Sequence, residues 1–162
     1  MNTKKLTLCA MLCAVAIILG YIESLFPLPI AIPGVKLGLG NIAILICLYL
    51  VSAPSAWCVM LIKVLTSVIL FSPPSTLIYS LFGGVLALIA MYISKKFKFN
   101  IISVSILGGI FHNLGQLSAA CLILDNINAI YYLPFMIIAG RIVACATRMA
   151  AKIIIRRISK LL

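Results

Sequence analysis

Five polar side chains inside long apolar runs are the residues of this sequence most suited to binding or catalysis. Lys63 and Arg141 are charged, whereas His112, Asn113 and Gln116 occupy the middle of one apolar run. His112 and Gln116 are four residues apart and Asn113 and Gln116 are three apart, so each pair shares one face of a helix. Within a membrane a Lys or Arg near the centre costs about 2.5–3.5 kcal/mol, so such groups are expected to face a protein interior or a water-filled cavity. For His112 and Asn113 two interpretations stay open: they line a substrate cavity, or they form hydrogen bonds between helices without a ligand. For Lys63 and Arg141 we expect a role in a cavity or an ion pair, and side chains that extend to the cytoplasmic interface are the alternative.

The segment from Glu23 to Asn41 is the second region that could take part in binding. It is apolar, rich in Pro and Gly, and too irregular for a helix. Irregular backbone at membrane depth is tolerated where it is buried in protein or lines a cavity. We therefore interpret this segment as a lid, with Lys36 and the start of the following helix available to an anionic group. A stiff connector that only packs against the bundle is the alternative.

The sequence argues against several kinds of catalysis. Its two acids, Glu23 and Asp125, are far apart, so neither a pair of catalytic carboxylates nor an acidic cluster for Mg²⁺ is present. A Walker A motif and a recognisable hydrolase motif are also missing. The six cysteines lie in apolar runs without the spacing of a metal site, so we expect small packing residues. We expect a protein that is not an enzyme and that holds no metal or cofactor.

The elements that position these residues are predicted to be membrane helices. Apolar residues form 65% of the 162-residue chain and charged residues 9%, whereas soluble domains have about 45–50% and 25%. The apolar runs are six: 6–22, 37–51, 55–71, 75–93, 100–124 and a last one from about 128 past Arg141. The pattern predicts an all-α polytopic membrane protein with six transmembrane helices in a single domain, residues 1–162. The second run is short, so five spans and a re-entrant segment are the main alternative.

The positions of the basic residues predict the orientation. The net charge is +11, and with six spans ten of the thirteen Lys and Arg residues fall on the side of both termini. Cytoplasmic loops are enriched in such residues, so we expect both termini in the cytoplasm and the protein in the plasma membrane. The charge then serves topology and contact with anionic lipids. Nucleic-acid binding is not expected, because the basic residues flank membrane spans and no nucleic-acid motif accompanies them.

Two stretches of the sequence resemble the signatures of a known family. Residues 33–41 (PGVKLGLGN) and 112–117 (HNLGQL) are similar to signature stretches of the Gx transporter family, also catalogued as heptaprenyl diphosphate synthase component I. That family in turn resembles the substrate-binding S components of energy-coupling factor (ECF) vitamin transporters, which are six-helix proteins with both termini inside. In S components an AxxxA pattern on the first helix docks on the transmembrane coupling subunit, and Ala10 and Ala14 match it.

The resemblance implies a membrane-embedded substrate-binding protein of an uptake transporter. It would capture a small cofactor or precursor, and Lys36, Lys63 and Arg141 favour a negatively charged one. A coupling protein and cytoplasmic ATPases would be its partners, because this chain has no energy source of its own. The expected substrate contacts, with Glu23 at the rim, are Lys36, Asn41, His112, Asn113, Gln116 and Arg141. Two alternatives remain: a non-catalytic membrane subunit associated with polyprenyl diphosphate synthesis, and a membrane anchor for an enzyme assembly.

Overall fold

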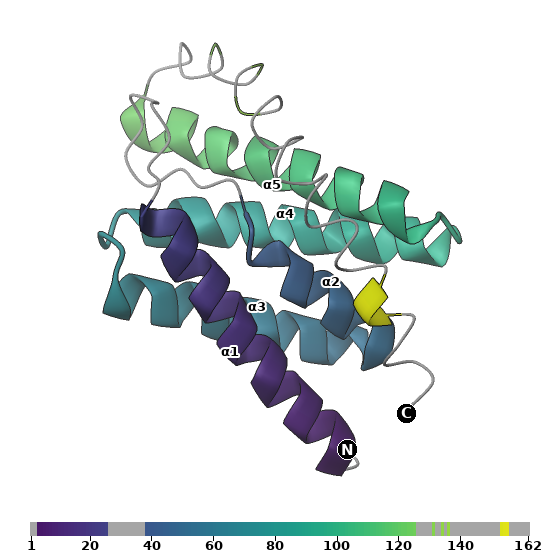
Figure 1. Cartoon of the computed structure of the whole chain (residues 1–162). Coiled ribbons are helices and arrows are strands. Elements are labelled where there is room, and N and C mark those ends of the chain that lie inside the picture. The colour runs from purple at the N-terminus through teal and green to yellow at the C-terminus, as the bar shows by residue number, and fades with distance from the viewer. Residues whose placement is uncertain are drawn as a thin grey trace.

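The computed structural model describes residues 3–25, 38–125, 131, 134, 136 and 153–155. These residues form helices and turns and contain no strand, which confirms the all-α class. Five helices follow one another along the chain (Figure 1): α1 (Thr3–Leu25), α2 (Asn41–Leu50), α3 (Ala53–Leu70), α4 (Thr76–Lys96) and α5 (Ile101–Leu124).

Four of these helices, α1, α3, α4 and α5, are long and apolar enough to cross a membrane. The predicted second span is shorter than expected. It is the helix α2, whose ten residues extend about 15 Å, half of a hydrocarbon core of about 30 Å. The predicted sixth run lies almost entirely outside the described residues. The described part of the chain therefore supports a membrane protein, and the count of six spans stays a prediction.

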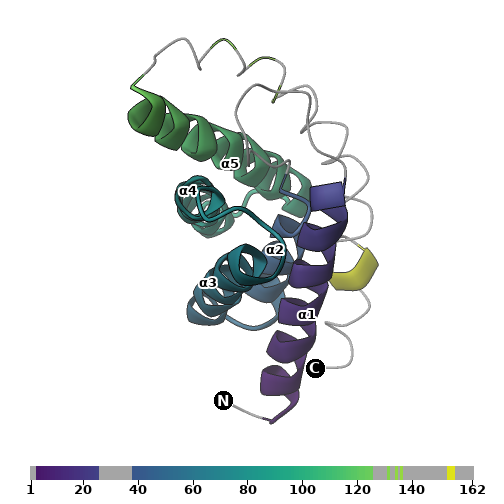
Figure 2. The same cartoon turned by 90° about the vertical axis from the view of Figure 1, so that its left-hand side faces the viewer.

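The short helix α2 lies at the centre of the bundle. It contacts each of the other four helices, and Figure 2 shows it between α1 and α3, with α4 and α5 above them in that view. Seven of its ten side chains are buried: Asn41, Ala43, Ile44, Leu45, Ile46, Cys47 and Leu48. A helix that is apolar around its whole circumference is expected in a core rather than on a surface.

Charged groups from two neighbouring helices lie at the two ends of α2. At its carboxyl end, Lys95 of α4 donates a hydrogen bond of 2.6 Å to the carbonyl oxygen of Leu48 and lies 4.8 Å from the centre of the Tyr49 ring. Before its amino end, the Glu23 carboxylate of α1 accepts a hydrogen bond from the N–H of Gly38. A helix is partially positive at its amino end and partially negative at its carboxyl end. Lys95 therefore brings a charge of the favourable sign to the carboxyl end of α2, and Glu23 brings one to the backbone before its amino end.

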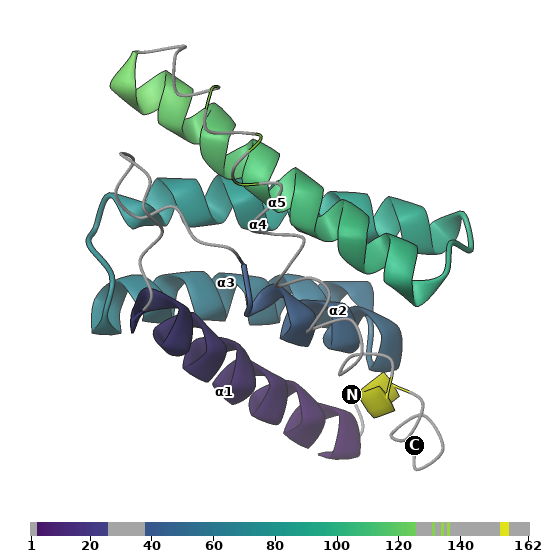
Figure 3. The same cartoon turned by 45° about the horizontal axis from the view of Figure 1, so that its top comes forward.

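Helices α4 and α5 form a closely packed hairpin. Figure 3 shows them side by side from their connection and diverging towards the opposite end. Gly115 permits the close approach, because a Cβ atom there would lie only 2.6 Å from the carbonyl oxygen of Phe82. At the start of α5 the side chain of Asn100 accepts a hydrogen bond of 2.7 Å from the N–H of Ser103, which caps the helix. This hairpin places the middle of α5 against the centre of the bundle.

Candidate ligand-binding site

Polar side chains from four helices meet inside the bundle and form what we term the buried polar cluster. Its members are Glu23 of α1, Asn41 of α2, Lys63 and Ser67 of α3, and His112 and Gln116 of α5. Lys63 is partly exposed and the other five are at most 9% exposed. Lys63 lies ten residues into α3 and His112 eleven residues into α5, about 15–17 Å along each helix. The cluster thus lies near the middle of both helices.

Gly38 brings the first members of the cluster together. Its φ angle is 84°, in the left-handed region that glycine tolerates best. Its N–H binds the Glu23 carboxylate. On its other side, an added Cβ atom would lie 2.7 Å from both Asn41 Nδ2 and His112 Cδ2. Both the backbone conformation and the lack of a side chain are therefore needed at this position.

His112 and Gln116 form the part of the cluster contributed by α5. Their Nε2 atoms lie 2.8 Å apart. An amide nitrogen only donates, so the ring nitrogen accepts this hydrogen bond and the imidazole proton lies on Nδ1. The Nδ1 atom faces Gly83 of α4, where an added Cβ atom would lie 2.8 Å from it. The ring is thereby fixed between α4 and α5.

Lys63 connects α3 to the amino end of α2. Its ammonium donates a hydrogen bond of 3.3 Å to Asn41 Oδ1. Beside it lies a cavity of about 10 Å³, lined by Gly20, Lys63, Val64, Ser67, Ser80, His112 and Gln116. That volume is about the space of one water molecule.

Asn41 Nδ2 and Ser67 Oγ are among the buried polar atoms of the cluster that find no hydrogen-bond partner within the described residues. Buried polar groups are nearly always paired, and leaving one unpaired costs about 1–3 kcal/mol. The cluster therefore has hydrogen-bonding capacity beyond what the described side chains use, as is expected of a site that receives a polar molecule.

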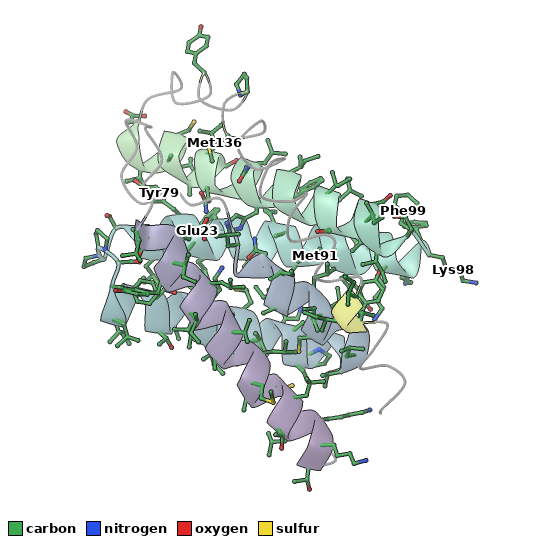
Figure 4. The ribbon with its side chains drawn as sticks, viewed as in Figure 1. Glu23, Tyr79, Met91, Lys98, Phe99 and Met136 are labelled. Atoms are coloured by element: carbon green, nitrogen blue, oxygen red, sulfur yellow. The ribbon has the colours of Figure 1, made fainter. Side chains whose placement is uncertain are left out.

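Four of the predicted substrate contacts lie in the cluster: Glu23, Asn41, His112 and Gln116. Asn113 is buried but faces elsewhere, because its Nδ2 donates a hydrogen bond of 3.0 Å to the carbonyl oxygen of Met136. Figure 4 shows Glu23 near the carboxyl end of α1 and Met136 next to α5. The other two predicted contacts, Lys36 and Arg141, lie outside the described residues.

Three polar residues that line the cavity are missing from the predicted set of contacts. The sequence predicts a cavity or ion-pair role for Lys63, but Lys63 is not among the predicted substrate contacts. Ser67 lies four residues after Lys63, so helical spacing places both on one face, and this signal was available in the sequence. Ser80 of α4 also lines the cavity, and nothing in its sequence context indicates this.

The predicted docking residues lie on a different part of the surface. Ala10 and Ala14 are exposed on α1. Ala10 also borders an apolar groove of about 460 Å³ between α1 and α3, with Cys9, Cys13 and Cys58 in its walls. Small exposed side chains allow another helix to approach closely. The docking role itself remains a prediction.

The described residues also define what chemistry the cluster offers. They contain no group of three or more His, Cys, Asp or Glu side chains that could hold a metal ion. The cluster combines one ammonium, one carboxylate, two amides, a hydroxyl and an imidazole that accepts at Nε2. These groups suit hydrogen bonding to a small polar molecule.

Comparison with known proteins gives one result. A family model described as heptaprenyl diphosphate synthase component I matches residues 12–154. Searches of curated proteins and of solved structures found no match.

Proposed function

The chain belongs to the heptaprenyl diphosphate synthase component I family, and from this premise we propose that it is a membrane-embedded binding protein for a small molecule. The observation that carries the proposal is the buried polar cluster. Five side chains that are at most 9% exposed place polar groups among apolar helices, and Asn41 Nδ2 and Ser67 Oγ have no hydrogen-bond partner within the described residues. A polar ligand that bonds to these groups would offset the cost of burying them.

A role in uptake fits this binding protein best. The resemblance to S components, the four membrane-type helices and the exposed Ala10 and Ala14 support a subunit that captures substrate and docks on a coupling protein. The energy for transport would come from cytoplasmic ATPases, because the sequence has no motif for ATP hydrolysis. The protein would lie in the plasma membrane with both termini in the cytoplasm, surrounded in part by anionic lipids.

The test is native mass spectrometry of the protein purified in mild detergent, with a search for a retained small molecule. Asn41→Ala and Gln116→Ala are expected to lose the molecule, because each removes an amide from the cluster. Ser118→Ala is the matched control on α5, since Ser118 is exposed and bonds only to its own helix through the Leu114 carbonyl. Retention that is identical in all variants, or absent from the wild-type protein, would contradict the proposal.

A second candidate function follows from the printed description of the family. The protein would be a non-catalytic membrane subunit beside a separate polyprenyl diphosphate synthase. The non-catalytic role is supported by composition, because Asp125 is the only Asp in the chain and the usual synthases bind Mg²⁺ through Asp-rich motifs. This candidate predicts that a soluble Asp-rich protein co-purifies with the chain, and that prenyl chain synthesis changes when the chain is lost. If neither effect is observed, this candidate is wrong.

A further inference from the structure

Among the described residues, Lys63 is the one Lys or Arg side chain in the buried polar cluster. It lies about 15 Å along α3, and its side chain runs towards the amino end of α2. A lysine at such a depth commonly extends along the lipid to reach the interface. Here Gly40 makes room for the Lys63 side chain to extend into the bundle, because an added Cβ atom at Gly40 would lie 2.7 Å from Lys63 Cε and 3.0 Å from Lys63 Nζ. The packing therefore directs the ammonium into the bundle.

The cavity beside Lys63 is bordered by several groups that can donate hydrogen bonds. Its walls contain the Lys63 ammonium, the Ser67 and Ser80 hydroxyls, the Gln116 amide and the His112 imidazole, and none of the described residues in its walls carries a carboxylate. Ser67 Oγ is 95% buried by residue and has no partner among the described residues. Asn41 Nδ2, at the amino end of α2, is also buried without a partner among the described residues, but it does not line the cavity. The Lys63 ammonium and the Ser67 and Ser80 hydroxyls offer a positive charge and N–H or O–H bonds to a group that enters the cavity.

The acid of the cluster has a partner of its own. Glu23 accepts the N–H of Gly38 just before α2, where the partial positive charge of the helix also lies. Glu23 does not line the cavity. Among the described residues, the cavity wall therefore contains the Lys63 ammonium and no carboxylate.

From these observations we propose that Lys63 binds an anionic oxygen of the ligand, from a carboxylate or a phosphate group, with Ser67 as the second donor. This inference rests on the proposed binding function and names the class of its ligand. Charge-assisted hydrogen bonds in a surrounding of low dielectric are the strongest that such a site offers. The cavity, with room for about one water molecule, takes one oxygen atom, and the remainder of the ligand lies outside it.

The experiment measures the melting temperature of the full chain in nanodiscs of zwitterionic phosphatidylcholine, with sodium phosphate or sodium acetate titrated against sodium chloride at equal ionic strength. Phosphate or acetate is expected to raise the melting temperature of the wild-type protein by mass action. Lys63→Met should abolish this rise, whereas Lys63→Arg should retain it. Lys96→Met removes an exposed base from the end of α4 and serves as the matched control, which should respond like the wild type.

A second variant keeps the test decisive if Lys63→Met does not fold. Ser67→Ala should fold and should weaken the apparent affinity for the same anion about tenfold, as expected for one hydrogen bond to a charged group. A parallel series in nanodiscs containing phosphatidylglycerol separates the two sources of the anionic group. If phosphatidylglycerol alone raises the melting temperature and Lys63→Met abolishes this rise, the anionic group belongs to a lipid headgroup.

The outcomes that overturn this inference differ from those that overturn the proposed function. If native mass spectrometry finds a retained neutral molecule and no anion raises the melting temperature, the protein binds a ligand but the anionic class is wrong. The inference also fails if Lys63→Met and Lys96→Met respond equally to the anions. If no molecule is retained and no anion acts, both the inference and the proposed function are wrong.

Discussion

Replacing Gly38 by alanine tests the geometry of the buried polar cluster most directly. The substitution adds a Cβ atom at a φ angle of 84°, which costs an L-residue about 1–2 kcal/mol. The same atom would lie 2.7 Å from Asn41 Nδ2 and from His112 Cδ2, and overpacking of this kind costs about 1–3 kcal/mol. We expect Gly38→Ala to lower the free energy of unfolding by about 2–5 kcal/mol.

The assay is equilibrium unfolding in mixed micelles, with Gly109→Ala as the matched control. Gly109 lies in α5, and a Cβ atom added there meets nothing within 4 Å. Alanine in an open helical position is expected to stabilise the protein by up to about 1 kcal/mol. The two glycine substitutions should therefore change stability in opposite directions.

A double-mutant cycle separates the two parts of the Gly38→Ala penalty. In the His112→Ala background the imidazole is missing, so the contact with the new Cβ is relieved in part and the penalty should become smaller. The strain of the backbone remains. A penalty that is the same in both backgrounds, or equal penalties for Gly38→Ala and Gly109→Ala, would refute this account of the cluster.

Three further predictions address the surroundings of the cluster. Lys95→Met should lower the free energy of unfolding by about 1–3 kcal/mol, because the last turn of α2 loses a charged hydrogen-bond donor. As a control, Lys96→Met at an exposed position should change the free energy of unfolding by less than about 0.5 kcal/mol. Gly115→Ala should cost about 1–3 kcal/mol in the same assay, since its Cβ would meet α4 backbone at 2.6 Å, and an unchanged stability would contradict the close α4–α5 contact. Ala10→Leu with Ala14→Leu should abolish co-purification with a coupling subunit while ligand retention and stability stay the same, because both positions are exposed; unchanged co-purification would count against docking there.

Much of the fold could be predicted from the distribution of apolar residues. The runs that begin near Leu6, Ser55, Ser75 and Asn100 correspond to α1, α3, α4 and α5. The second run was expected over residues 37–51, whereas α2 occupies Asn41–Leu50. Hydropathy does not detect this difference, because Gly38 and Leu39 are compatible with an apolar run while the positive φ angle of Gly38 interrupts the helix.

The candidate site could be predicted only where helical spacing determines the contact. The spacing of four correctly predicted that His112 and Gln116 share a face, and the structure shows them hydrogen-bonded. Asn113 is next to His112 in sequence, so it points in another direction and bonds to Met136. The approach of Gly83 to His112 depends on how α4 packs against α5, and no local pattern encodes it.

The charged groups at the two ends of α2 have a mechanical consequence. Glu23 belongs to α1 and binds the backbone just before α2, whereas Lys95 belongs to α4 and binds its last turn. If α1 slides along its own axis, the bond at Gly38 persists only if α2 moves with it, and that movement changes the distance from Leu48 to Lys95. The short helix is thus bonded to α1 through the residue before its amino end and to α4 through its last turn. We therefore expect motion that begins at the polar cluster and motion that begins at the far end of α4 to be linked through the same ten residues.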